Sequence, residues 1–248
     1  MDLRGKCILI TGGANGIGRA LVEACSPIAN TSIAIFDKEP STTSSFHSPN
    51  VLYKCCDISD PAQVKDGVSQ IEKELGPIDI LVNNAGLIHN EPLISWASTG
   101  VVQHNINTWN DVIQTNINAV FYVTLHTVSS MIARRNHGIV INISSICASG
   151  NAGQSAYSAS KAALNAMTVS WAKELGPLNI RFISVAPGFV KTNKTLDLLT
   201  QDQLKSLARK TPLRKIGSVD QVIETIKFVI SNDFINGTVI EVNGGLRI

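Results

Sequence analysis

A glycine-rich turn directly after the first apolar segment constrains the fold of this chain more than any other feature. Residues 6–11 have the pattern of a short buried strand, and Gly12, Gly16 and Gly18 follow before an amphipathic segment begins. This order predicts a strand, a turn and a helix. Such a turn lets the backbone approach a pyrophosphate closely, and the next helix offers unpaired N–H groups at its N-terminus. A glycine turn also occurs for structural reasons alone, so it needs support from the rest of the chain.

Asp37 provides that support. Residues 32–36 read as a second buried strand, and Asp37 follows Gly18 by nineteen residues. A carboxylate at this place accepts hydrogen bonds from an adenosine ribose and repels a 2′-phosphate, which favours NAD(H) over NADP(H) as the cofactor. Lys38 weakens this preference, because a neighbouring cation partly offsets the repulsion. The alternative is that Asp37 only caps a turn before Pro40.

Apolar strand patterns alternate with helical patterns along the remaining chain. This alternation predicts an α/β fold, a doubly wound parallel sheet of the Rossmann type with helices on both faces. The length of 248 residues fits a single domain over residues 1–248. The further strands are expected at 51–56, 78–82, 138–143, 180–185 and 238–242.

Three segments interrupt the alternation. Residues 39–50 are rich in Ser, Thr and Pro, so the crossover helix there is expected to be short or replaced by a loop. Residues 87–108 have an irregular pattern, which predicts an extended loop before a helix that begins near Trp109. We interpret this loop as a substrate-side flap or a partner contact. Residues 189–214 read as a helical excursion over the substrate side of the crevice.

Small and polar residues follow several of the predicted strands. Because the carboxyl ends of parallel strands meet at one edge of the sheet, we expect these residues to line one crevice that holds the dinucleotide. Asp57 and Ile58 would lie near the adenine, and residues 83–86 where the middle of the cofactor passes. The expected cofactor contacts are Gly12, Asn15, Gly16, Ile17, Gly18, Asp37, Asp57, Ile58, Asn84, Ala85, Gly86, Tyr157, Lys161, Pro187, Gly188, Val190 and Thr192.

The segment 142–161 supplies the reactive groups. It places Ser144 and Ser145 at the end of a predicted strand, and Tyr157 and Lys161 four residues apart on a predicted helix. That spacing puts the phenol and the ammonium on one helix face. The pKa of a free tyrosine is near ~10, and Lys161 and an oxidised nicotinamide would both favour the phenolate. With a hydroxyl from the strand end, these groups can donate and accept a proton at a carbonyl.

Six short motifs stand in a fixed order along the chain: Thr11-Gly12-x-x-x-Gly16-x-Gly18, Asn83-Asn84-Ala85-Gly86, Asn116, Ser145, Tyr157-x-x-x-Lys161 and Pro187-Gly188. At these spacings the chain resembles the short-chain dehydrogenase/reductase family over essentially its whole length. The resemblance implies that Tyr157 donates or accepts the proton, Ser145 holds the substrate oxygen and Lys161 binds the nicotinamide ribose. It also implies a water-linked proton path at Asn116, a carboxamide contact for Thr192, and self-association as a dimer or tetramer.

The sequence departs from the family pattern at three places. Ser145 precedes Tyr157 by one residue fewer than is common, so Ser144 is a rival for the catalytic hydroxyl. Only one of two consecutive strand residues faces the crevice, and we favour Ser145 from its place in the Asn-x-Ser-Ser motif. Ile183 stands where the family often has Asn, with no consequence that we can argue, and the long 87–108 segment leaves the substrate open.

Composition argues against several other classes of protein. The net charge is only +2 and the cations are scattered, so no nucleic-acid partner is expected. No apolar run is long enough to span a membrane and no signal peptide precedes the first strand, so we expect a cytoplasmic protein. The five cysteines form no C-x-x-C pair, so no metal site is expected. His89 and His104 are expected to be non-catalytic, because no carboxylate or nucleophile accompanies them at a suitable spacing.

Together these features predict an oxidoreductase that interconverts a secondary alcohol and a ketone or aldehyde by hydride transfer, with NAD(H) preferred and a small-molecule substrate. Tyr157 would act as the general acid or base, with Asn116, Ser145 and Lys161 completing the catalytic set. Two alternatives stay open. One is an NADP(H)-linked 3-oxoacyl reductase, and the other is a dinucleotide-binding regulatory protein without catalytic activity.

Overall fold

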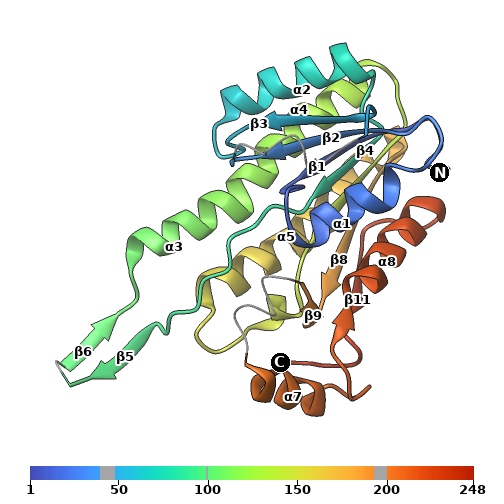
Figure 1. Ribbon diagram of the computed structural model, residues 1–248. Coiled ribbons are helices and arrows are strands. Elements are labelled where there is room, and N and C mark those ends of the chain that lie inside the picture. The colour runs from blue at the N-terminus through green and yellow to red at the C-terminus, as the bar shows by residue number, and fades with distance from the viewer. Residues whose placement is uncertain (40–47, 99, 193–199) are drawn as a thin grey trace.

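The computed structural model describes residues 1–39, 48–98, 100–192 and 200–248. Its main sheet consists of β1 (Cys7–Thr11), β2 (Ser32–Asp37), β3 (Val51–Cys55), β4 (Ile80–Asn83), β7 (Gly138–Ile143), β8 (Ile180–Pro187) and β11 (Thr238–Val242). The strands are parallel and lie in the order β11-β8-β7-β4-β1-β2-β3 (Figure 1). The order reverses between β1 and β4, which is where a doubly wound sheet opens a crevice for a ligand.

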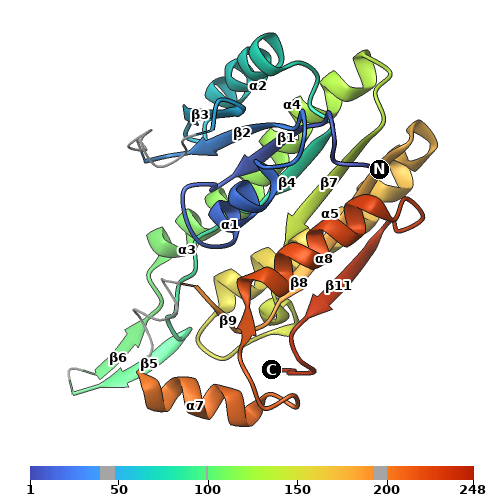
Figure 2. The ribbon, with the colours of Figure 1, turned by 45° about the vertical axis from the view of Figure 1, so that its right-hand side comes forward.

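Helices cover both faces of this sheet, because its strand side chains point alternately to either side. Ile8 and Ile10 lie in one core with residues of α1 (Gly16–Cys25) and α8 (Val219–Ser231). Leu9 and Phe36 lie in a second core with residues of α2 (Pro61–Leu75), α4 (Ala119–Ala133) and α5 (Ser155–Leu175). Figure 2 shows the two layers of helices on opposite sides of the strands. The predicted Rossmann-type fold is confirmed.

The segment 87–108 differs from the extended loop that we predicted. It contains a two-stranded antiparallel hairpin, β5 (Ile94–Ala97) and β6 (Gly100–Gln103), that projects from the body of the molecule (Figure 1). The strands are four residues long, which is too short for their alternation to be recognised in the sequence. The helix α3 (Ile106–Ile113) begins earlier than expected, because the Asn105 side chain accepts hydrogen bonds from the N–H groups of Asn107 and Thr108.

The base of the hairpin corrects the reason that we gave for regarding the two histidines as non-catalytic, because a carboxylate does accompany them. Glu91 lies with both of them, since its Oε2 is 3.1 Å from Nε2 of His89 and 3.3 Å from Nδ1 of His104. The carboxylate also accepts a hydrogen bond from the N–H of Asn105 at 3.1 Å. These contacts close the base of the hairpin. The contact between Glu91 and His104 could not be read from the sequence, because these residues lie on opposite sides of the hairpin.

The other two irregular segments are described in part. Residues 40–47, where a short crossover helix or loop was expected, lie outside the described residues. Within 189–214, β9 (Val190–Lys191) pairs with β10 (Gly217–Ser218), and the helix α7 (Gln201–Lys210) follows after residues 193–199, which are also outside the described part. The Thr200 side chain and the Gln203 side chain cap the first turn of α7 reciprocally.

Candidate active site

The turn between β1 and α1 is packed so closely that two of its glycines leave no room for a side chain. Gly12 has a φ of +66°, and a Cβ there would lie 2.9 Å from the Cα of Ala85. A Cβ on Gly18 would lie 2.2 Å from the carbonyl oxygen of Gly12. Gly16, by contrast, has nothing within 4 Å of its Cβ position, so bare backbone borders open space at the N-terminus of α1. This cradle fits the pyrophosphate of a dinucleotide.

Asn84 and Thr11 hold this turn in place. The Asn84 side chain donates to the carbonyl oxygens of Thr11 at 3.1 Å and Gly12 at 2.9 Å. The Thr11 hydroxyl oxygen accepts hydrogen bonds of 3.1 Å from the N–H groups of Asn84 and Ala85. The end of β4 and the glycine turn therefore form one rigid edge of the crevice. Of the two other expected contacts in the turn, Asn15 precedes α1 in an extended conformation and Ile17 packs partly against the core.

At the end of β2, Asp37 lies beside the glycine turn, and its Oδ2 accepts a hydrogen bond of 3.1 Å from the N–H of Ala14. Lys38 forms an ion pair of 3.0 Å with Asp57. Asp57 also accepts hydrogen bonds from Ser59, whose hydroxyl is the main cause that lowers the pKa of this carboxyl group. The carboxylate of Asp57 is therefore occupied by Lys38 and Ser59. Its neighbour Ile58 packs against the core on the α2 side.

Ser145, Tyr157 and Lys161 come together at the carboxyl end of β7. The Nζ of Lys161 donates a hydrogen bond of 2.7 Å to the carbonyl oxygen of Ile143 and lies 5.7 Å from the centroid of the Tyr157 ring. The Ser145 hydroxyl lies close enough to the Tyr157 phenol to lower its pKa. A Cβ on Gly86 would lie 3.5 Å from Lys161 Nζ, so the cofactor edge of the crevice meets these groups directly.

Burial controls the protonation of this group. Burial raises the pKa of Tyr157 to about 12, although the Ser145 hydroxyl acts in the opposite direction. Burial also lowers the pKa of Lys161 to about 8. The phenol is therefore protonated near neutral pH. The ammonium of Lys161 is directed at the Ile143 carbonyl, and our expectation that it favours the phenolate stays a prediction.

Asn116 lies fully buried in a π-helical turn, Gln114–Asn118, between α3 and α4. Its Nδ2 donates to the Leu87 carbonyl oxygen at 2.9 Å and to the Ser160 hydroxyl at 3.0 Å, and its Oδ1 accepts from the Leu87 N–H at 2.7 Å. Both N–H groups of the amide are thus used by protein atoms. A water-linked proton path at Asn116 stays a prediction. Because the side-chain amide is already used, such a path would have to involve the backbone of this π-helical turn.

The two rival serines have different surroundings. Ser144 is buried, and its hydroxyl donates a hydrogen bond of 3.3 Å to the backbone carbonyl of Lys161. Ser145 accepts a hydrogen bond of 3.1 Å from the N–H of Cys147, and its hydroxyl lowers the pKa of Tyr157. This geometry favours Ser145 as the hydroxyl beside the phenol.

The turn after β8 borders the same site. A Cβ on Gly188 would lie only 2.9 Å from the backbone that follows β11. Phe189 packs against the cluster that contains Tyr157, and Val190 is buried. The N–H of Thr192 donates to the Val190 carbonyl at 3.0 Å. Phe189 is thus the residue of this turn that contacts the cluster around Tyr157, and the cofactor contacts expected at Pro187, Gly188, Val190 and Thr192 stay predictions.

Two residues of this site were missed in the sequence. Ser160 joins Asn116 to the helix that bears Tyr157. Its position three residues after Tyr157 is the one sequence feature that could have indicated this role. Cys147 is close enough to influence the pKa of both Tyr157 and Lys161. Burial raises the pKa of its thiol, so it is protonated at neutral pH. Nothing in the spacing of Cys147 distinguished it from a core residue.

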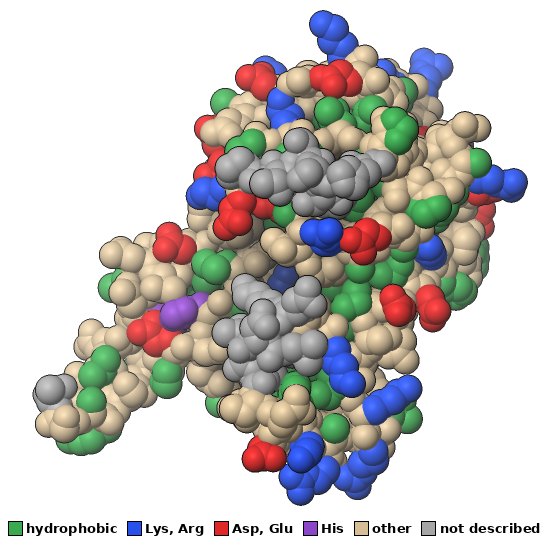
Figure 3. Space-filling model, in the orientation of Figure 1, with side chains coloured by type: hydrophobic (Ala, Val, Ile, Leu, Met, Phe, Trp, Pro, Cys, Tyr) green, Lys and Arg blue, Asp and Glu red, His purple; other side chains and the backbone are tan. Residues whose placement is uncertain are grey.

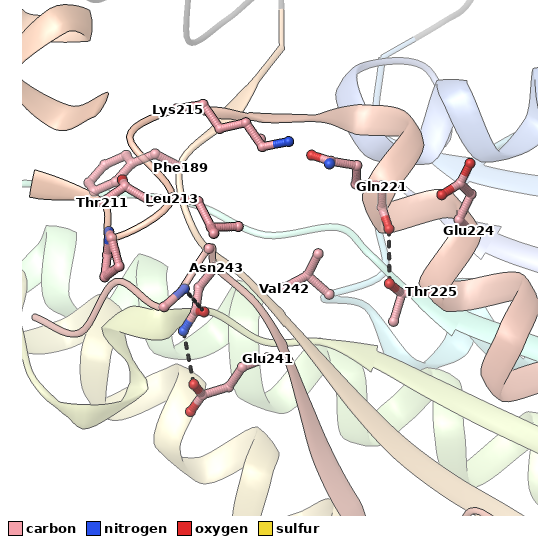
Figure 4. Close-up of a pocket in the computed structure, with 14 residues that line it drawn as sticks. Phe189, Thr211, Leu213, Lys215, Gln221, Glu224, Thr225, Glu241, Val242 and Asn243 are labelled. Atoms are coloured by element: carbon pink, nitrogen blue, oxygen red, sulfur yellow. Dashed lines mark hydrogen bonds between the residues drawn. The ribbon is translucent and has the colours of Figure 1, made fainter. Parts of the chain in front are cut away.

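A separate cavity of about 640 Å³ has Phe189 in its wall (Figure 4). Its walls come from the turn after α7, the first half of α8 and the chain after β11, and Figure 4 shows Lys215, Glu224 and Glu241 among them. None of the four expected catalytic residues lines it. The cavity is therefore distinct from the site around Tyr157.

Comparison with known proteins agrees with this geometry. The family model described as short chain dehydrogenase matches residues 6–203. The chain belongs to the short-chain dehydrogenase/reductase family. As a member of this family it is an NAD(P)-dependent oxidoreductase, and the glycine cradle and the crevice fit a bound dinucleotide.

Curated relatives cover this short-chain dehydrogenase from end to end. It is 36% identical to the 3-oxoacyl-(acyl-carrier-protein) reductase of Thermotoga maritima, with 100% of both chains aligned. It is 32% identical to the protein of the same name from Escherichia coli strain K12, with 99% of both chains aligned. The corresponding protein of Buchnera aphidicola subsp. Baizongia pistaciae is 33% identical over 97% of both chains. Among the described residues of this chain, each helix is too short or too polar to cross a lipid bilayer.

Proposed function

We propose that this protein interconverts a secondary alcohol and a ketone or aldehyde, with Tyr157 as the general acid or base. The observation that carries the proposal is the group of Ser145 with the buried Tyr157 and Lys161 beside Gly86, at the edge where the dinucleotide cradle ends. A bound dinucleotide supplies or accepts the hydride. The protein supplies a proton donor, a second hydroxyl and a cation at the reacting oxygen.

In the direction of carbonyl reduction, the protonated phenol of Tyr157 is ready to give its proton to the substrate oxygen. Ser145 would hold that oxygen through its hydroxyl, and Lys161 would bind the ribose and restore the proton balance. In the direction of alcohol oxidation, the phenol must first lose its proton, which its raised pKa opposes. A positively charged nicotinamide close to the phenol would reduce that cost.

Two contacts support NAD(H) as the preferred cofactor. Asp37 ends β2 beside the glycine turn, so its carboxylate stands where a ribose 2′-hydroxyl would be recognised and a 2′-phosphate repelled. Lys38 is the neighbouring cation that would offset the repulsion between Asp37 and a 2′-phosphate. In the structure it forms an ion pair with Asp57. That ion pair partly neutralises Lys38, so Asp37 has the stronger influence on the choice between the two cofactors.

The similarity to the 3-oxoacyl-(acyl-carrier-protein) reductases supports a second candidate, the reduction of a 3-oxoacyl substrate. Its chemistry is the same carbonyl reduction at the same Tyr157. The two candidates differ in the substrate and in the preference for NADPH. A comparison of a 3-oxoacyl thioester with simple ketones as substrates, each with NADH and NADPH, separates them.

The decisive experiment is Tyr157→Phe, measured as NADH consumption with a panel of ketones and as NADH binding by fluorescence. We expect turnover to fall by at least ~100-fold while NADH binding stays near that of the wild type. Tyr122→Phe on α4 is the matched control and should leave turnover unchanged. Wild-type rates in Tyr157→Phe would remove Tyr157 from the mechanism. Tight NADH binding without hydride transfer in the wild-type protein would instead support a regulatory role.

A further inference from the structure

Two imidazoles share one carboxylate at the base of the hairpin of β5 and β6. Oε2 of Glu91 lies 3.1 Å from Nε2 of His89 and 3.3 Å from Nδ1 of His104, and the two rings meet edge to face with their centroids 5.9 Å apart. Figure 3 shows histidine side chains beside an acidic side chain at the surface, where the projecting hairpin joins the body of the molecule. The catalytic groups described above do not include this cluster, so it needs an explanation of its own.

The chain that carries the cluster borders the active site at two places. It starts beside the catalytic groups, since a Cβ on Gly86 would lie 3.5 Å from Nζ of Lys161. Five residues later it meets the loop that leads into α5, where the N–H of Glu91 donates to the carbonyl oxygen of Gly153 at 2.7 Å. His89 lies between these two anchor points. The segment therefore runs along the crevice on the side of the catalytic groups.

His104 has a structural role in the cluster. Its Nδ1 also lies 3.1 Å from the backbone carbonyl oxygen of Glu91, and its N–H donates to the Leu93 carbonyl at 3.0 Å. The side chain is only 9% exposed, it packs edge to face on Trp109, and its Nε2 is buried without a hydrogen-bond partner among the described residues. Together with the N–H of Asn105, which donates to the same carboxylate at 3.1 Å, His104 closes the base of the hairpin.

His89 is not needed for that closure, and its side chain is more exposed. The exposed fraction is 32%. Glu91 holds the ring at Nε2, whereas Nδ1 has no hydrogen-bond partner within the part of the chain that the structure describes. A carboxylate bound to one ring nitrogen fixes the orientation of an imidazole and leaves the other nitrogen for a ligand. His89 therefore has one oriented nitrogen to offer beside the crevice.

The chemistry of Glu91 decides what that nitrogen binds. The N–H of Asn105, and then the His89 side chain, hold the pKa of Glu91 below its ordinary value, so its carboxylate is ionised and can only accept hydrogen bonds. Nε2 of His89 must therefore carry the proton that joins the two side chains. In the neutral ring, Nδ1 then has a lone pair and accepts. The group of a small carbonyl compound that matches such an acceptor is a hydroxyl.

We propose that His89 is a specificity-determining residue, which recognises a hydroxyl group of the substrate through Nδ1. This inference rests on the proposed function and narrows its substrates to ketones that carry a hydroxyl group, or to the corresponding diols in the oxidative direction. Glu91 is the positioning residue that orients the ring. His89 takes no part in the transfer of the proton or the hydride, so Tyr157 keeps that role.

Two ketones of nearly equal shape test the proposal. In 4-hydroxy-2-butanone a hydroxyl replaces one methyl group of 2-pentanone, and we expect the wild type to have a kcat/KM at least ~10-fold higher for the hydroxyketone. His89→Gln keeps an N–H for Glu91 but has no counterpart of Nδ1. It should lose the preference through a higher KM for 4-hydroxy-2-butanone and leave 2-pentanone unaffected.

His137→Gln is the matched control for these kinetics. His137 is exposed and precedes β7 at the opposite edge of the sheet, so the same substitution there should leave both ketones unaffected. Equal kcat/KM for the two ketones in the wild type would overturn the proposal. So would a preference that survives in His89→Gln, or an equal loss for both ketones in that variant.

Glu91→Gln tests the orientation of the ring. An amide binds the imidazole less strongly than a carboxylate does, so nitrogen NMR should show the ring proton shared between Nε2 and Nδ1 of His89. The preference for 4-hydroxy-2-butanone should fall, while kcat for 2-pentanone stays near that of the wild type. A lost preference with the proton still on Nε2 would mean that Glu91 does not act through the ring.

NMR of the ring nitrogens also makes the test independent of turnover. In Tyr157→Phe with bound NADH neither ketone should be consumed, so the signals of His89 can be followed while each ketone is added. Nδ1 should be unprotonated, and its signal should move with 4-hydroxy-2-butanone but not with 2-pentanone. A protonated Nδ1, or equal responses to the two ketones, would contradict the proposal. If the wild type reduces neither ketone and Nδ1 responds to the hydroxyketone alone, the proposed function fails and the role of His89 in binding stands.

Discussion

The side-chain amide of Asn116 donates a hydrogen bond of 3.0 Å to the hydroxyl of Ser160, which joins the π-helical turn to the helix that carries Tyr157. The Ser160 hydroxyl in turn donates to the Tyr157 carbonyl oxygen at 2.7 Å. Both residues are fully buried, so water cannot replace either bond. The position of the phenol thus depends on a hydroxyl that need not touch the substrate.

Ser160→Ala tests this dependence. The variant leaves one N–H of Asn116 without its partner and loosens the start of α5, so we expect kcat to fall about tenfold. The KM for the dinucleotide should stay close to the wild-type value, because the glycine cradle is untouched. Steady-state kinetics separate the two constants. Ser170→Ala, on the exposed side of the same helix, is the control, and an unchanged kcat in Ser160→Ala would show that the link is not needed.

Cofactor preference follows from the different surroundings of Asp37 and Lys38. Asp37→Ser removes the carboxylate that faces the ribose position, so the ratio of kcat/KM for NADH to kcat/KM for NADPH should fall at least ~10-fold. Lys38→Ala should change this ratio little, because Lys38 is paired with Asp57. The comparison uses both cofactors with one substrate. If Lys38→Ala selectively weakens NADPH, then Lys38 leaves Asp57 to bind the phosphate and the argument for NAD(H) fails.

The buried ammonium of Lys161 should make stability depend on pH. Burial lowers its pKa from an ordinary value of 10.5 to about 8, so the unfolded chain binds more protons between these values and stability increases with pH there. The total gain is ~3 kcal/mol. The raised pKa of Tyr157 has the opposite effect, but only above pH 10. Urea unfolding at several values between pH 7 and pH 10 measures the change.

Lys161→Met is the matched variant for that measurement. It cannot titrate, so the wild type should gain about 2 kcal/mol relative to it between pH 8 and pH 10, which is most of the total. At pH 7 the variant should be at least as stable as the wild type, because it buries no charge. It should also be inactive, since the cation at the site is lost. Parallel curves of stability against pH for the two proteins would mean that Lys161 is not desolvated to this extent.

The expected groups did come together where the fold places them. Gly12, Asp37, Gly86 and Tyr157 lie far apart in the chain but all follow strands of one parallel sheet, whose carboxyl ends share an edge. That is why strand patterns and small-residue turns were enough to bring them to one crevice. Their roles in binding and catalysis stay proposals that the variants above test.

Other features could not be predicted because they depend on contacts between distant residues. Glu91 and His104 meet only when the hairpin closes, and Asn116 meets Ser160 only when two helices pack. The choice between Ser144 and Ser145 likewise needed the direction of each side chain at the end of β7. No pattern within a single segment contains this information.

By itself, the sequence determined the parallel sheet, the glycine cradle and the pairing of Tyr157 with Lys161 on one helix face, because strand, turn and helix periodicities are local properties. Only the tertiary structure decided the protonation of Tyr157 and Lys161, because desolvation depends on everything packed around a group. It also revealed the hairpin of β5 and β6, whose strands are defined by pairing with each other and not by burial.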